Sequence, residues 1–92
     1  MTGKWEIDKD MKPCKLCGDV ADAFTDATEY FVGATYLPVL YVGKQIVSGC
    51  NYMFVCKQIL STEHTDTHVV KMVIYKPVKG KAEILSVEQL FF

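Results

Sequence analysis

The segment YVGKQIVSGCNYMFVC, residues 41–56, joins two strand-like runs through a short turn. Ser48-Gly49 can reverse the chain, because glycine adopts turn conformations that are closed to other residues. After the turn, Tyr52, Phe54 and Cys56 alternate with the residues between them, which is the period of a half-buried strand. The segment therefore predicts a β-hairpin that turns one face toward a core.

The rest of the chain after Gly33 is also predicted to form strands. Pro38 places the start of the first one near a sheet edge or a strand entry, since proline cannot donate to a ladder. Strands rich in β-branched and aromatic residues are expected at residues 37–47, 51–60, 68–76 and 82–91. Short loops between them favour antiparallel neighbours and hence a meander.

One helix is predicted ahead of these strands, from about Asp19 to about Phe31. Val20, Phe24, Ala27 and Phe31 recur at i, i+4, i+7 and i+11, which places them on one helical face. Asp19 can cap the first turn, where an acidic side chain also suits the helix dipole. A glycine two residues beyond Phe31 is expected to end the helix.

The chain is short, and its size limits what it can do. A domain of 92 residues buries somewhat more than roughly 60% of its unfolded surface, so most of its 50% hydrophobic residues must serve the core. Little apolar surface is left for a catalytic cavity, which favours a binding module over an enzyme. Residues 1–13 read as an arm or an irregular first strand. We therefore expect one α+β domain over residues 1–92, with a single helix packed across a four- to five-stranded antiparallel sheet.

Charge and hydropathy exclude several classes of partner. Ten basic and eleven acidic residues give a net charge of −1, which is not the basic footprint of a nucleic-acid binder. No apolar run approaches the roughly 20 residues that span a bilayer, so no membrane partner is expected. The first six residues lack the apolar core of a secretory signal. A cytoplasmic location is expected, or a secreted one if a signal peptide has been removed.

Four cysteines leave two disulfides, four free thiols and a metal site open. Cys14 and Cys17 resemble the C-x-x-C at the helix start of thioredoxin and glutaredoxin folds, where the helix N-terminus stabilises a thiolate. Too few residues separate Cys14 from Pro38 for the strand and second helix of those folds. Cys50 and Cys56 can share a strand face but lie too far apart along it to bond each other. We expect free or buried thiols, no bound metal and no cofactor.

The predicted hairpin resembles that of the cystatins, which are inhibitors of papain-like cysteine proteases. The cystatin motif is Q-x-V-x-G, usually followed one residue later by Asn-Tyr. The residues that match it here are Gln45, Val47, Gly49, Asn51 and Tyr52. The family's second landmark, a hairpin that contains proline, has its counterpart in Pro77-Val78, and its third, a glycine ahead of the helix, in Gly3.

The resemblance implies a reversible, competitive inhibitor of papain-like, cathepsin-like cysteine proteases. In the family, the tip of the first hairpin wedges beside the catalytic cysteine without offering a correctly oriented peptide bond. Small residues at such a tip let backbone atoms enter a narrow cleft, and Gln45 is expected to brace the loop. No side chain has a convincing nucleophile, base and orienting partner, so no catalytic residue is expected. The protease-binding residues that the resemblance implies are Gly3, Gln45, Ile46, Val47, Ser48, Gly49, Pro77 and Val78.

Some positions depart from the family pattern. Ser48 stands where the family usually has alanine, and Val78 stands where tryptophan is frequent outside the stefin branch. The cysteines do not match the paired disulfides of secreted cystatins, which favours the stefin-like, intracellular branch. Two alternatives remain: a non-inhibitory binding module with the same fold, and a small C-x-x-C thiol-disulfide oxidoreductase. We expect a monomer, with a domain-swapped dimer as the alternative.

The remaining polar residues are assigned to solvated surface. His64 and His68 lie in or beside a polar loop, where a surface role is expected rather than a ligand pair. Asp22, Asp26 and Glu29 are expected on the wet face of the helix.

Overall fold

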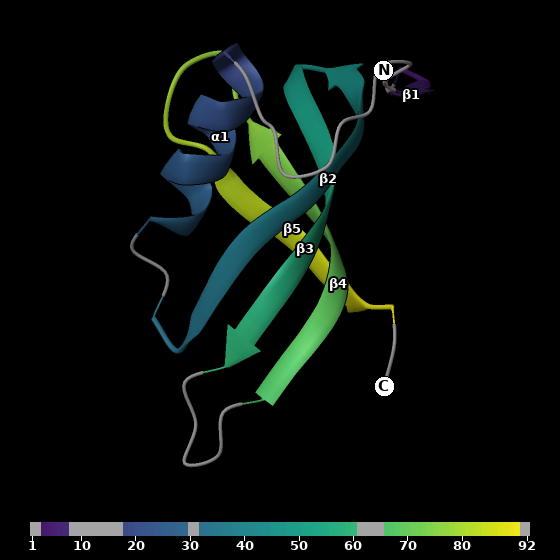
Figure 1. The fold of residues 1–92 in the computed structure, drawn as a ribbon. Coiled ribbons are helices and arrows are strands. Elements are labelled where there is room, and N and C mark those ends of the chain that lie inside the picture. Colours follow the sequence, from purple (N-terminus) through teal and green to yellow (C-terminus); the bar gives the residue numbers. More distant parts are fainter. Residues whose placement is uncertain (1–2, 8–17, 30–31, 61–65, 91–92) are drawn as a thin grey trace.

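A computed structural model describes residues 3–7, 18–29, 32–60 and 66–90 (Figure 1). Its five strands form one antiparallel sheet in the chain order β1-β2-β3-β4-β5. The described residues contain one helix, so the expected α+β class and the meander are confirmed. The elements are β1 (Trp5–Ile7), α1 (Gly18–Thr28), β2 (Ala34–Val47), β3 (Gly49–Leu60), β4 (Asp66–Lys76) and β5 (Glu83–Gln89).

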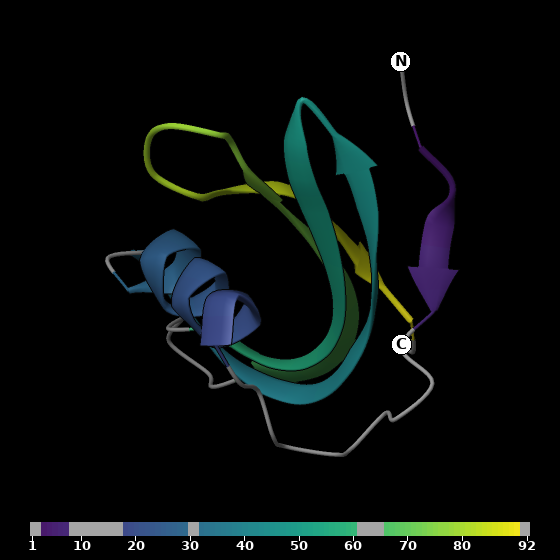
Figure 2. The ribbon, with the colours of Figure 1, turned by 90° about the horizontal axis from the view of Figure 1, so that it is seen from above.

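The core lies between α1 and the concave face of the sheet, which curves around the helix (Figure 2). Phe24 on α1 packs edge-to-face against Phe54 on β3, with ring centroids 5.1 Å apart. Val20 and Ala27 pack against the same cluster, as the helical period predicts. Four side chains from β3 and β4 have no exposed surface: Phe54, Cys56, Met72 and Ile74.

The helix is shorter than its apolar period predicts. It ends at Thr28 rather than near Phe31, which lies outside the described residues. The hydroxyl of Thr28 donates a 2.8 Å hydrogen bond to the carbonyl of Phe24 in the last turn. Threonine is a weak helix former, because its β-branched, hydrogen-bonding side chain competes with the helical backbone. The helix therefore stops before Gly33, whose φ of 92° belongs to the connection that leads into β2.

The start of β2 differs from the prediction in one respect. The strand begins at Ala34, so Pro38 lies inside it, opposite Cys56, rather than at its entry. Among the described residues β1 pairs only with residues 43–45 of β2, so Pro38 does lie on a sheet edge, which was the other expected position. The pairing with β3 shifts register between Pro38 and Leu40, and such an irregularity tolerates a residue that cannot donate to the ladder. A second shift follows between Tyr41 and Gly43, and irregularities of this kind increase local twist and bending.

The bounds of the last two strands differ less from expectation. β4 begins two residues before His68, and β5 runs over residues 83–89 rather than 82–91. The N-terminal arm supplies a fifth strand, because Trp5 pairs with Gln45 and Ile7 pairs with Gly43. In the described part of the chain, no helix is long and apolar enough to cross a membrane.

Candidate protein-binding edge

Three segments that are far apart in the sequence meet at one end of the sheet. They are the arm at Gly3, the tip of the β2–β3 hairpin at residues 45–49, and the start of the β4–β5 hairpin at Pro77-Val78. We call these eight residues the binding edge. The backbone N–H of Gly3 donates a 2.9 Å hydrogen bond to the carbonyl of Ile46, which joins the arm to the first hairpin. The structure thus brings together the residues that the sequence singled out.

The tip of the first hairpin is very tight. Val47 and Gly49 are paired across it, and Ser48 alone lies between the two strands. Gly49 has a φ of 106°, which side chains of L-residues rarely allow. A Cβ atom at Gly49 would also lie 2.4 Å from the carbonyl oxygen of Lys76 and 3.0 Å from the Cα of Pro77. Glycine is therefore required here both by its own backbone and by the closeness of the second hairpin.

The second hairpin holds the first tip from the side. The hydroxyl of Tyr75 donates a 2.6 Å hydrogen bond to the carbonyl of Ser48. The loop itself is closed by the ammonium of Lys76, which donates to the carbonyl of Gly80. Its far side is tied to α1, because the N–H of Ala82 donates a 2.7 Å hydrogen bond to a carboxylate oxygen of Asp26. The two hairpins and the helix are thus connected by polar contacts as well as by the core.

Asp26 corrects one expectation about the helix. It was expected on the wet face with Asp22 and Glu29, but it is half-buried and accepts the Ala82 hydrogen bond. Asp22 and Glu29 are exposed, as expected. A contact between residues on two elements 56 positions apart leaves no signal in the local helical period.

The arm is held by side-chain amides. The Nε2 of Gln45 donates a 2.9 Å hydrogen bond to the carbonyl of Gly3, and the Nδ2 of Asn51 donates a 3.0 Å hydrogen bond to the Oε1 of Gln45. A Cβ atom at Gly3 would lie 2.6 Å from the carbonyl oxygen of Ile46, so the arm can approach this closely because residue 3 is glycine. Gln45 was expected to brace the loop. The hydrogen bond from its Nε2 shows that it braces the arm against the hairpin.

The exposed side chains of the binding edge are apolar or small. Ile46 is 50% exposed and Val78 is 77% exposed, while Ser48 is exposed at the tip and Val47 is half-buried. None of the eight residues of the edge carries a charged side chain. Such a surface can bury apolar groups and backbone atoms against a protein partner.

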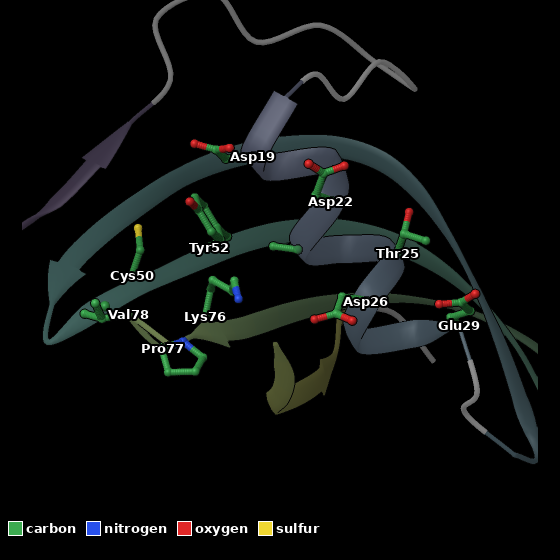
Figure 3. A pocket seen from close by; sticks show the side chains of 12 residues that line it. Asp19, Asp22, Thr25, Asp26, Glu29, Cys50, Tyr52, Lys76, Pro77 and Val78 are labelled. Atoms are coloured by element: carbon green, nitrogen blue, oxygen red, sulfur yellow. The ribbon is translucent and has the colours of Figure 1, made fainter. Parts of the chain in front are cut away.

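A cavity of about 660 Å³ lies between α1 and the two hairpins (Figure 3). Pro77 and Val78 of the binding edge form part of its wall, together with Cys50 and Tyr52 from β3. Four acidic residues, three on α1 and one just after it, line its other side: Asp19, Asp22, Asp26 and Glu29. Sequence reasoning missed this cavity, because the tilt between a helix and two hairpin tips has no signature in a local pattern.

The described cysteines face the core. Cys56 is fully buried, and burial raises the pKa of its thiol to about 12, so it is an unreactive thiol. Cys50 is half-buried beside the cavity. Burial, and next the neighbouring Cys50, raise the pKa of Tyr52 to about 12. Cys14 and Cys17 lie outside the described residues, and so the oxidoreductase alternative stays open.

No cluster of three potential metal ligands occurs among residues 3–7, 18–29, 32–60 and 66–90. His68 contacts the side chain of Gln89 at the exposed surface, while His64 lies outside the described residues. Comparisons of the chain with models of protein families, with curated proteins and with solved structures found no match. The fold and the edge therefore define the protein by class: an α+β domain with one helix on a five-stranded antiparallel sheet in its described part.

Proposed function

We propose that the protein is a reversible, competitive inhibitor of papain-like cysteine proteases, with a cystatin fold of the stefin-like type. The observation that carries the proposal is the meeting of Gly3, the first hairpin tip and Pro77-Val78 at one end of the sheet. These are the three segments that the cystatin resemblance singles out for insertion into a protease cleft. Segments that are distant in sequence must lie side by side if they are to enter one protease cleft together.

The geometry of the tip supports inhibition rather than cleavage. The chain reverses between Val47 and Gly49, and the carbonyl of Ser48 is held by the hydroxyl of Tyr75. A backbone turned this tightly cannot extend along a cleft as a substrate does. A partner can therefore bind the tip without finding a peptide bond in the orientation that its catalytic cysteine needs.

Affinity would come from apolar and backbone contacts. Ile46 and Val78 are the exposed apolar side chains of the edge, and none of its eight residues carries a charge. A standard protein–protein interface buries about 1,200–2,000 Å² in total, and affinity within that size depends on a few well-packed anchors. We propose Ile46 and Val78 as those anchors.

The test is inhibition of papain and of a cathepsin-L-like enzyme by the wild-type monomer and by Ile46→Glu and Val78→Glu. Both side chains are exposed, so the fold should tolerate the substitutions. A carboxylate buried without a partner in the complex should weaken inhibition by about a thousandfold. The matched control is Leu85→Glu, because Leu85 is 58% exposed on β5, outside the binding edge.

Failure has a clear form. If the wild-type monomer does not inhibit several such proteases at micromolar concentration, the inhibitor proposal is wrong, and a non-inhibitory binding module takes its place. If the wild type inhibits but both edge variants inhibit equally well, the binding edge has been misplaced. Gly49→Glu is a poorer test than either variant, because Gly49 has no room for a Cβ atom and the fold itself would suffer.

A further inference from the structure

We infer that the side-chain amides of Gln45 and Asn51 form a clamp that fixes the N-terminal arm on the first hairpin, so that arm and hairpin meet a partner as one preformed unit. The second half of this inference rests on the proposed function. The clamp itself is a property of the free protein and can be tested without a protease. Gln45 and Asn51 would then be positioning residues, since they act through the arm.

The chemistry of the clamp requires an amide in the middle. Gln45 uses both ends of its side chain: Nε2 donates to the carbonyl of Gly3 at 2.9 Å, and Oε1 accepts from the Nδ2 of Asn51 at 3.0 Å. Only a side chain with a donor and an acceptor at its end can satisfy both neighbours at once. Gln45 and Asn51 face each other across the hairpin as paired residues, so the clamp stands on both of its strands.

Few other contacts hold the start of the arm. β1 spans residues 5–7 and pairs with β2 over three positions. Ahead of it, among the described residues, Gly3 is held by its backbone bond to Ile46 and by the Gln45 amide. When so few hydrogen bonds determine whether a segment is docked, the loss of one should change the docked population measurably.

Asn51 supplies a second, independent observation. Its Oδ1 atom is buried and has no hydrogen-bond partner among the described residues. A buried carbonyl oxygen without a partner costs stability, and an apolar residue of similar shape would avoid that cost. The presence of an amide at position 51 is explained if the Nδ2 of Asn51 is needed to orient Gln45. Position 51 would then serve the arm at the expense of the fold.

The chain carries its own reporter of arm docking. Trp5 is the single tryptophan of the sequence, lies on β1 and pairs with Gln45. Fluorescence anisotropy and acrylamide quenching of Trp5 therefore measure whether the arm is docked. Gln45→Glu keeps the shape and the acceptor but loses the donor to Gly3, and it should lower the ratio of docked to free arm by about fivefold. Trp5 anisotropy should fall, and quenching should rise.

The matched control is Gln58→Glu, which makes the same charge change where the amide donates to the hydroxyl of Tyr36 rather than to the arm. It should leave the Trp5 signal unchanged.

A second variant, Asn51→Leu, should lower the anisotropy of Trp5 while the melting temperature stays the same or rises. A merely structural role for Asn51 would not produce this combination. An unchanged Trp5 signal in Gln45→Glu would overturn the clamp, and so would an equal change in the Gln58→Glu control.

Papain inhibition tests the joint binding of arm and hairpin. Deletion of residues 1–4 should weaken inhibition by the wild type, and it should weaken inhibition less in Gln45→Glu, where the arm is docked less often. If the two losses simply multiply, the arm and the hairpin bind independently, and the preformed unit is wrong. If the wild type does not inhibit at all, the proposed function fails, and the Trp5 measurement alone decides the clamp.

Discussion

The hydroxyl of Tyr75 on β4 donates a 2.6 Å hydrogen bond to the carbonyl of Ser48 at the tip of the β2–β3 hairpin. This contact joins the two hairpins of the binding edge, and it lies at the exposed surface. Because the tip consists of one residue between two paired strands, fixing the Ser48 carbonyl fixes the direction of the whole tip. The shape of the edge is thus set within the free protein, which would reduce the entropy cost of the proposed binding.

Tyr75→Phe tests the value of this contact. A hydrogen bond contributes about 0.5–1.5 kcal/mol, so the melting temperature should fall by several degrees at most and the fold should be kept. Inhibition should weaken by about fivefold, chiefly through faster dissociation, because the tip can then move in the complex. Tyr36→Phe makes the same chemical change away from the edge and should leave inhibition unaltered. Equal inhibition by wild type and Tyr75→Phe would show that the hydrogen bond from Tyr75 to Ser48 does not matter for binding.

Gly3→Ala probes the close approach of the arm. The added Cβ atom would lie 2.6 Å from the carbonyl oxygen of Ile46, so the arm must shift away from the hairpin. Inhibition should fall about as far as it does on deletion of residues 1–4, while the rest of the fold stays intact. Lys4→Ala is the control, because the Lys4 side chain is exposed. Full inhibition by Gly3→Ala would contradict the tight packing of the arm.

Gly49→Ala and Gly33→Ala separate backbone strain from close packing. Both glycines have positive φ, at 106° and 92°, so alanine strains both by about 1–3 kcal/mol. At Gly33 a Cβ atom meets nothing within 4 Å, whereas at Gly49 it meets the backbone of Lys76 and Pro77. Urea unfolding should therefore show a clearly larger loss for Gly49→Ala, by at least about 1 kcal/mol. Equal losses of stability in the two variants would mean that the second hairpin moves away from a Cβ atom at position 49 without an energetic penalty.

Stability should fall in alkaline solution because of two buried groups. Burial raises the pKa of Cys56 from 9.0 to about 12 and, with help from Cys50, that of Tyr52 from 10.0 to about 12. Between about pH 9 and pH 12 the folded protein therefore keeps protons that the unfolded chain loses. The stability that these groups contribute is fully present below about pH 9 and is lost as the pH rises toward 12.

Urea unfolding at a series of pH values measures this loss. Each group should contribute a slope of up to about 1.4 kcal/mol per pH unit within its window. Cys56→Ala should flatten the decline that begins near pH 9, and Tyr52→Phe should flatten the decline that begins near pH 10. A decline of the same steepness in both variants as in the wild type would assign the effect to other groups.

The sequence was sufficient for those parts of the fold that follow a local period. The helical period that includes Phe24 predicted the buried face of the helix, and the alternation from Tyr52 to Cys56 predicted the buried face of the sheet. Both predictions were correct, because burial imposes these spacings. Pro38 lies on a sheet edge, as one of its two expected positions required, but β2 begins before it, because an irregular register with β3 accommodates the proline and no local pattern reveals that register. The end of the helix was also predicted incorrectly, because the apolar period continues past Thr28 although the helix does not.

The binding edge could be foreseen only in part. The resemblance pointed to residues 45–49, to Pro77-Val78 and to Gly3, but the contacts that shape the edge join residues from different elements. Gln45 reaches the carbonyl of Gly3 across 42 positions, and Asp26 reaches Ala82 across 56. Such contacts depend on how the layers pack and not on local propensity. The sequence therefore named the three segments of the edge, while the contacts that hold them together follow from the packing of the fold.

The agreement between strand order and chain order has a consequence for how the molecule forms. Each strand pairs with the next one along the chain, so β2 to β5 can assemble by successive zipping of local hairpins. Helix α1 precedes β2 in the chain but contacts β4 and β5 as well as Phe54 of β3, so it must close a long loop before it can dock fully. We expect the hairpins to emerge first on the folding pathway and the helix to seal the core last, with slower refolding of variants in β3 and β4 and faster unfolding of variants in α1.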